Sequence, residues 1–311
     1  MEIRINLVSD WAVYLMRRLD AIGGQLKNLP PTPADIGKAF FNAALRRIPA
    51  RPRRTHMPAP PIQPPAGLSL AKGYQEVVAA SENGGDLFPF QSTGLLAHDG
   101  KDLMLFDWGI YHLHLSVDPH PKKAGFNART EPLLYVIVTD DDLYQIAIKP
   151  HGEWSCVELL DIVEKNWPHL LEHARCGMKV ANAVSTDQEI ESMRKHQINC
   201  AVRLSSGNVY SFLASGIAMS GESFKANKAM IDAHRILQAV ERKVKEKSQE
   251  LELELGRDGR ALPETAAIRL VVDAHSVKVV EEASGLVLHD FSTNEQALLF
   301  GGAIFNLARD L

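Results

Sequence analysis

Apolar residues recur every three or four positions in several parts of the chain, as expected of amphipathic helices. Helices are predicted over residues 9–26, from Pro33 onward, and over 68–78, 155–172 and 223–249. In the last of these, an apolar stripe of Met230, Leu237, Val240 and Val244 lies on one face. Such a stripe is typical of a helix that buries one side.

Alternating or β-branched runs between these helices predict strands. Strands are expected over residues 110–115, 133–138, 143–148, 200–204, 209–213, 251–255, 268–272, 277–280 and 286–289. The aspartates of residues 139–142 suit a tight turn, so residues 133–148 should form a hairpin. The order of elements predicts an α+β fold: a central antiparallel sheet module with flanking helices, an N-terminal helical segment, and a C-terminal module with a long helix and a β meander.

The same pattern divides the chain into four parts. These are an N-terminal helical segment over 1–48, a linker over 49–66, a central α+β module over 67–175 that is the candidate catalytic module, and a C-terminal α+β module over 176–311. The linker holds seven prolines, which fix φ and remove amide donors. We therefore expect it to be extended and open to proteases.

Composition sets the broad class of the protein. The 311 residues are 45% hydrophobic and 23% charged, with a net charge of −4, which is ordinary for a globular chain. There is no apolar run of the ~20 residues that a membrane span requires and no secretory start, so a cytoplasmic protein without a membrane partner is expected. Three cysteines, at 156, 176 and 200, favour reduced thiols over disulfides.

Candidate chemistry centres on the stretch Asp107–Leu115, which carries His112 and His114. Side chains alternate along a strand, so the two imidazoles share a face, with Tyr111, Leu113 and Leu115 on the other. The hairpin that follows is entered by Arg129 and Glu131 and left by Lys149 and His151. If the strand pairs with the hairpin, these groups converge.

Together, these residue types suit the cleavage of RNA without a metal. Histidine exchanges protons near neutral pH, and a guanidinium can hold a phosphate and stabilise its growing charge. We therefore predict His112, His114, Arg129 and His151 as catalytic residues, with no metal or cofactor. Tyr111, Tyr144 and Lys149 are predicted to bind substrate. The function predicted is that of an endoribonuclease or other phosphodiester-cleaving toxin or defence effector.

Two resemblances accompany this interpretation. The motifs D-W-G-I-x-H-x-H-L, R-T-x-P-L-L, P-H-G-x-W and N-W-P resemble a group of uncharacterised bacterial proteins over residues 46 to about 172. The order of elements over 68–151 separately resembles the small RelE-like endoribonuclease toxins, whose sheets carry Arg, Lys, His and Tyr. That second resemblance implies RNA as substrate and an antitoxin as partner. The chain departs from these toxins in its greater length, its acidic balance and its third module.

Other interpretations remain open on the sequence. The histidines could be structural in a protein-binding or regulatory module, or they could bind zinc with His151 or Asp107 as a third ligand. Arginines clustered between residues 17 and 54 could contact phosphate or an acidic partner. The stripe on helix 223–249 could pair two copies of the chain. Candidate partners are thus RNA, a protein such as an antitoxin, and a second copy.

Overall fold

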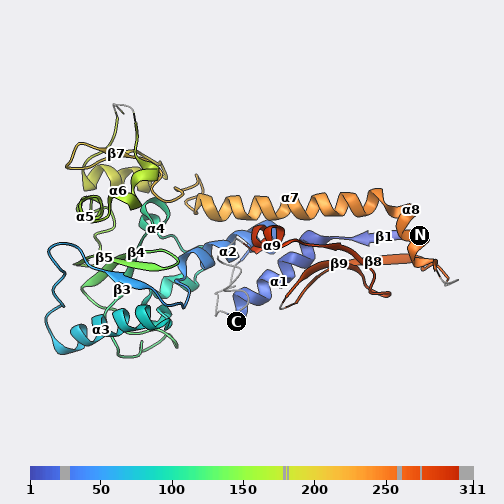
Figure 1. The fold of residues 1–311 in the computed structure, drawn as a ribbon, viewed down its shortest axis with the longest axis horizontal. Coiled ribbons are helices and arrows are strands. Elements are labelled where there is room, and N and C mark those ends of the chain that lie inside the picture. The colour runs from blue at the N-terminus through green and yellow to red at the C-terminus, as the bar shows by residue number, and fades with distance from the viewer. Residues whose placement is uncertain (22–28, 178–179, 181, 258–260, 274, 301–311) are drawn as a thin grey trace. The chain divides into compact units, whose positions relative to one another are not determined.

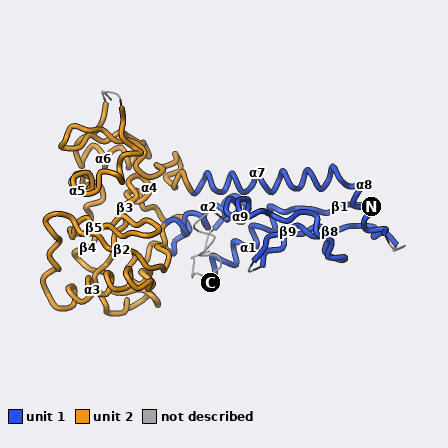
Figure 2. Tube along the Cα trace, viewed as in Figure 1, with its two compact units in different colours: residues 1–45, 96–98, 226–311 blue, residues 46–95, 99–225 orange. Residues whose placement is uncertain are grey.

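The structure is a computed structural model that describes residues 1–21, 29–177, 180, 182–257, 261–273 and 275–300. The chain has an α+β fold and forms two compact units (Figure 2). Unit 1 comprises residues 1–45, 96–98 and 226–311, and unit 2 comprises residues 46–95 and 99–225. Across the described residues, no helix combines the length and apolar character needed to cross a membrane.

The elements are labelled in Figure 1. The helices are α1 (Leu7–Ala21), α2 (Pro33–Arg46), α3 (Leu68–Asn83), α4 (Leu103–Trp108), α5 (Glu158–Asn166), α6 (Asp187–Lys195), α7 (Phe224–Glu246), α8 (Ser248–Leu255) and α9 (Thr293–Phe300). The strands are β1 (Glu2–Ile5), β2 (Arg54–His56), β3 (Ile110–His114), β4 (Leu133–Val138), β5 (Asp142–Lys149), β6 (Val202–Arg203), β7 (Val209–Tyr210), β8 (Thr265–Val272), β9 (Val277–Glu281) and β10 (Val287–Asp290).

Unit 2 is built on a sheet of order β2-β5-β4-β3, with β2 parallel to β5 and the other pairs antiparallel. Because side chains alternate along each strand, the sheet has two buried faces. One face packs with Tyr74 and Val77 of α3, and the other packs with Leu159 and Leu160 of α5. In Figure 1, α3 and α5 accordingly lie on opposite sides of this sheet. The β6–β7 hairpin extends the core on the α5 side.

Unit 1 joins the two ends of the chain. Its sheet has the order β1-β8-β9-β10, in which β1 runs parallel to β8. One core unites this sheet with α1, α2, α7 and α9, and its fully buried side chains include Trp11, Phe41 and Leu237. The indole N–H of Trp11 donates to the carbonyl of Leu299 at 3.0 Å. The N-terminal segment is therefore part of the same core as the C-terminal elements.

These units differ from the four-part division expected from the sequence. The N-terminal segment and the residues beyond 226 form one unit, because β1 pairs with β8 and Trp11 packs against elements near the C-terminus. Residues 176–225 instead belong with the central sheet, since Val202 and Tyr210 are buried in its α5-side core. Neither association could be predicted from the sequence, because the segments that pack together lie far apart along the chain.

Most predicted elements are present. α1, α2, α3, α5 and α7 lie at the expected positions, as do the hairpin β4–β5, the short hairpin β6–β7 and the terminal strands β8, β9 and β10. The first predicted helix ends at Ala21, and the remainder of its range, residues 22–26, lies outside the described residues. Elements that repeat their pattern over many residues were thus the predictable ones.

The proline-rich segment is only partly a linker. Arg54, Thr55 and His56 form β2 and pair with β5 at the edge of the central sheet. The amide of Arg53 donates to the carbonyl of Ser81 at 2.8 Å, and its buried guanidinium donates to the carbonyls of Thr139 and Pro49. The expectation of a wholly open segment is therefore wrong for residues 53–56. The prolines lie on either side of β2 and leave its amides free to bond.

Two other expectations are also wrong. Residues 251–255 were expected to be a strand from their alternation, but they lie in α8, where only Leu251 is buried. The stripe on α7 was a candidate seam between two copies, but Leu237, Val240 and Val244 are buried in the core of unit 1. That stripe is therefore not an exposed surface on which a second copy could pack.

Candidate functional site

The histidine strand begins directly after a short helix. Asp102 caps the start of α4 by accepting a hydrogen bond from the amide of Leu105 at 3.0 Å, and Gly109 ends the helix with a φ of 75°. Asp107 and Trp108 therefore belong to a helix that precedes the histidine strand. The left-handed conformation of Gly109 allows the chain to turn at once into β3.

β3 presents His112 and His114 on one face. Leu113 and Leu115 are buried in the core on the α3 side, whereas Ile110 of β3 is buried on the α5 side. His112 lies opposite Tyr135 of β4 and His114 opposite Leu133, both of which also belong to the α5 side. Alternation along the strand thus places both imidazoles on the α5 side.

His112 combines burial with a carboxylate neighbour. Its side chain is 13% exposed, and its Nδ1 lies 3.6 Å from Oδ2 of Asp102. Nδ1 is buried without a hydrogen-bond partner. The ring packs against the indole of Trp154, with 4.7 Å between centroids. Burial lowers the pKa of His112, and the charge of Asp102 partly opposes this. The imidazole is therefore neutral at neutral pH, as a general base must be.

His114 is more deeply buried, with 2% exposure. Its Nδ1 accepts a hydrogen bond from the amide of Thr130 at 3.0 Å, and its Nε2 is buried without a partner. Thr130 also accepts from the amide of Leu115 at 2.9 Å. Burial, with smaller contributions from His112 and Arg129, lowers the pKa of His114 to about 4. His114 therefore holds in place the segment that carries Arg129 and Glu131.

Arg129 and His151 are in direct contact at the surface. Nη2 of Arg129 lies 2.9 Å from Nε2 of His151, and a guanidinium has only donors, so Nε2 is the acceptor. Oε2 of Glu131 accepts the backbone N–H of His151 at 2.9 Å, and Oε1 lies 4.0 Å from Nδ1. His151 packs edge-on against Trp154 at 4.8 Å. Donation from Arg129 and the nearby carboxylate together favour the tautomer with its proton on Nδ1.

The four residues predicted as catalytic lie near one another. Arg129 and His151 are close enough to lower the pKa of both His112 and His114. The indole of Trp154 contacts the rings of His112 and His151. We define the acid–base cluster as His112, His151, Arg129 and the two carboxylates of Asp102 and Glu131. It offers two imidazoles, each with a carboxylate nearby, and one guanidinium.

The three residues predicted to bind substrate are buried or engaged in other contacts. Tyr111 points to the α3 side of the sheet, where burial raises its pKa. Tyr144 is 6% exposed and stacks on His56 at 4.6 Å, with Trp167 edge-on to it. Neither ring has a free face at the acid–base cluster. Nζ of Lys149 pairs with Glu158 at 2.7 Å. Alternation along β3 already separates Tyr111 from His112, because odd and even positions face opposite sides.

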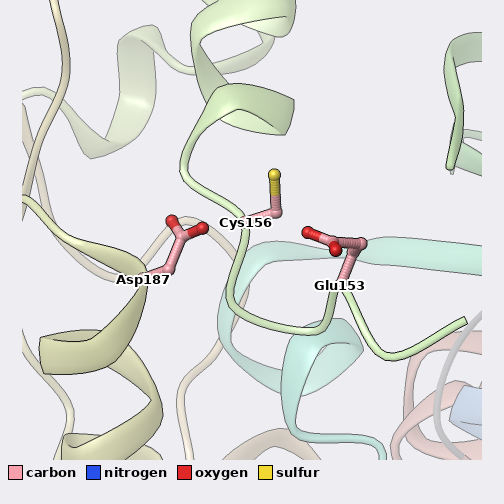
Figure 3. A group of neighbouring side chains, drawn as sticks. All are labelled: Glu153, Cys156 and Asp187. Atoms are coloured by element: carbon pink, nitrogen blue, oxygen red, sulfur yellow. The ribbon is translucent and has the colours of Figure 1, made fainter. Parts of the chain in front are cut away.

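The arrangement of ligand types does not favour the zinc hypothesis for the histidines. Asp107 is 7% exposed and is held by Arg194, which also packs over Trp108 at 4.1 Å. Within the described part of the chain, the one group of three metal-ligand side chains within 4.8 Å is Glu153, Cys156 and Asp187, shown in Figure 3. That group contains no histidine.

The contacts of this group account for it without a ligand. Oδ1 of Asp187 accepts the amide of Val157 at 2.8 Å, so it ties the start of α6 to the start of α5. Burial raises the pKa of Cys156, and the ammonium of Lys149 lies close enough to oppose that effect. The thiol is therefore protonated at neutral pH.

The arginines near the N-terminus are largely engaged with the protein itself. Arg46 and Arg53 are buried and donate to backbone carbonyls. Arg51 and Arg54 pair with Asp140 and Asp142 at 2.8 Å. These contacts compete with phosphate for the guanidinium groups. Arg129, by contrast, lies next to the histidines of the acid–base cluster.

Sequence reasoning missed Asp102 and Trp154. Asp102 precedes a helix, and its type and position signalled only an N-cap. Trp154 is partly buried against the α5-side core, and its ring also contacts the rings of His112 and His151. The P-H-G-x-W spacing, with Trp154 three residues after His151, was the available signal for the second contact.

Comparison of the chain with protein families, with curated proteins and with solved structures found no match in any of the three.

Proposed function

We propose that the acid–base cluster cleaves phosphodiester bonds in RNA without a metal. The observation that carries the proposal is the chemistry of the cluster itself: two imidazoles against one indole, each near a carboxylate, with a guanidinium bonded to one of them. Internal cleavage of RNA needs a base for the 2′-hydroxyl, an acid for the leaving oxygen and a cation for the phosphate. The cluster supplies one group for each role.

His112 is assigned as the base. Its lowered pKa keeps the imidazole neutral, and Asp102 stabilises the charge that arises when it takes the 2′-hydroxyl proton. The 2′-oxygen then forms a bond to phosphorus, and the bond from phosphorus to the 5′-oxygen breaks. A protonated His151 gives its proton to that oxygen. The products are a 2′,3′-cyclic phosphate and a 5′-hydroxyl end.

Arg129 and His114 take different parts. Arg129 is exposed and lies beside His151, so it can donate to the non-bridging oxygens and stabilise the pentavalent phosphate. His114 is a positioning residue in this scheme, because its side chain is buried and its contact is with the backbone of Thr130. Its replacement should affect activity through Arg129 and Glu131.

The test is cleavage of varied RNA substrates by the full chain in excess EDTA. Activity should persist, and His112→Ala or His151→Ala should each reduce it by about 100- to 10,000-fold, the usual effect of losing a positioned acid or base. The matched control is His275→Gln, which changes an exposed histidine in unit 1. Activity that EDTA abolishes and zinc restores, or a folded wild type that cleaves no RNA, would overturn the proposal.

The second candidate function is protein binding, and one observation favours it. In unit 2, Ile198, Met219 and Phe224 are 50%, 93% and 55% exposed. Hydrogen bonds join their segments, since Asn199 contacts Ile217 and the amide of Phe224 donates to the carbonyl of Gly216. Exposed apolar side chains on neighbouring segments are typical of protein-binding surfaces when they form a contiguous patch. In a nuclease, the protein that binds this surface would be an inhibitor.

A further inference from the structure

In the free protein, the contact between Arg129 and His151 prevents His151 from acting as the acid of the proposed RNA cleavage. Nε2 of His151 carries its lone pair toward Nη2 of Arg129, at 2.9 Å. An imidazole in this state cannot give a proton from Nε2, and it cannot gain one there while the guanidinium N–H occupies that position. The described conformation is therefore unable to supply the acid.

We propose that a phosphate group of the substrate draws Arg129 away from His151, and that His151 is protonated at Nε2 only after this exchange. The inference rests on the proposed function and adds to it a step in which substrate binding creates the acid. Phosphate is the ligand class because its oxygens are charged acceptors that match the guanidinium fork.

The energies favour the exchange. A contact between the guanidinium and phosphate joins two charged partners and can be bidentate, whereas His151 offers Arg129 a single neutral acceptor. Among the described residues, the hydrogen bond to His151 is the one that Arg129 makes with its side chain, so its other donors are available to a phosphate. A bidentate contact with phosphate would therefore replace a single bond.

The polar groups that face His151 change once Arg129 has moved. The groups around the ring are Arg129, Glu131, His112 and the indole of Trp154. Oε1 of Glu131 lies 4.0 Å from Nδ1, and a bound phosphate adds negative charge beside Nε2. Both ring nitrogens then face acceptors, whereas in the free protein Nε2 faces a donor.

His114 fixes the backbone next to the contact between Arg129 and His151. Its Nδ1 accepts from Thr130, and Thr130 Oγ1 in turn donates to the carbonyl of Pro132 at 2.8 Å. Thr130, which lies between Arg129 and Glu131, is thus anchored to β3 and also bonded to Pro132. The exchange then requires movement of the Arg129 side chain alone, while Glu131 stays against His151.

The experiment follows the ring nitrogens of His151 by ¹⁵N NMR on the full chain at pH 7, with inorganic phosphate as probe and sodium chloride at equal ionic strength as reference. His151→Gln identifies the signals. Without phosphate, the wild type should show a protonated Nδ1 and a bare Nε2. Phosphate should bring both nitrogens to the protonated signature. In Arg129→Gln the Nδ1–H tautomer should lose its preference, and phosphate should have at least a tenfold weaker effect.

The control is Arg54→Gln, which removes another exposed arginine of unit 2 and should respond as the wild type does. A phosphate response in Arg129→Gln as large as that of the wild type would overturn the proposed exchange. So would an Nε2 signal of the wild type that phosphate leaves unchanged, whether or not phosphate shifts other signals. Failure of the proposed exchange is distinct from failure of the proposed function. RNA cleavage without a phosphate response at His151 would contradict only the exchange, and a phosphate response without RNA cleavage would contradict the nuclease function.

Discussion

Asp102 and His112 are the residue pair whose electrostatics should be visible in kinetics. The carboxylate favours the protonated form of His112, and burial opposes it more strongly. Asp102→Asn keeps a side chain that caps α4 and removes the charge. The pKa of His112 should therefore fall further, so the acidic limb of kcat/KM should move to lower pH.

The measurement is the pH profile of RNA cleavage, and Asp118→Asn, at an exposed position, is the matched control. The rate on the plateau should also fall, because a weaker base takes the hydroxyl proton less readily. A profile that coincides with that of the wild type would separate Asp102 from the chemistry and leave it as a helix cap.

At His114, burial should make the protein sensitive to acid. Its folded-state pKa of about 4 lies below the unfolded value of about 6.5, so the unfolded chain binds the proton first. Stability from this residue is therefore complete above pH 6.5 and is lost as the pH falls toward 4. Over that window the loss is about 3 kcal/mol.

His114→Gln removes the titrating group and keeps an acceptor for the amide of Thr130. Urea unfolding at pH 7 and pH 4.5 should show a smaller loss in the variant than in the wild type, and the same loss as the wild type in the exposed-site control His275→Gln. Equal losses in all three proteins would contradict a buried neutral His114.

Among the elements, α7 offers the clearest test of core packing. Leu237 is fully buried on its inner face, and Ile231, on the same helix, is 42% exposed. Leu237→Ala should lower the free energy of unfolding by ~2 to 5 kcal/mol through lost burial and the cavity that remains. Ile231→Ala should change it by less than about 1 kcal/mol. Chemical denaturation measures both, and similar values for the two variants would remove Leu237 from the core.

β2 is the element that the sequence concealed, and hydrogen exchange can establish it. The amides of Arg53 and Arg54 donate to the carbonyls of Ser81 and Asp141 at 2.8 and 2.9 Å. They should exchange far more slowly than the amides of Gln63 and Ala66, which lie outside the helices and strands. Exchange at equal rates in the two stretches would return the whole segment to a linker.

What could be predicted from the sequence follows the range of the interactions. The shared face of His112 and His114 depends only on strand alternation, and so it was predictable. β1 and β2 are short strands whose partners lie far along the chain, so their own residues carry almost no signal. Alternation misled at residues 251–255, where the leucines of α8 other than Leu251 are not buried and no packing enforces a period of two. The contacts of Asp102 and Trp154 arise from loops that tertiary packing positions.

At the scale of the whole molecule, each hydrophobic core belongs to one unit. The two cores on either side of the central sheet draw their residues from positions 48–213, and the core of unit 1 draws its own from positions 1–45 and beyond 226. All residues of the acid–base cluster lie in unit 2. The acid–base cluster thus lies in unit 2, whereas the N-terminal and C-terminal elements share the core of unit 1.

A fragment of residues 46–225 should therefore fold alone and keep any RNA cleavage, because it retains both cores of unit 2 and the complete cluster. A fragment of residues 46–311 should lose the fold of unit 1, since it lacks Trp11, Phe41 and the strand that pairs with β8. Urea unfolding should show one cooperative transition for the first fragment, and ¹⁵N spectra of the second should show the signals of residues 226–300 collapsed into the range of an unfolded chain. A non-cooperative 46–225 fragment would mean that unit 2 depends on contacts outside its own cores.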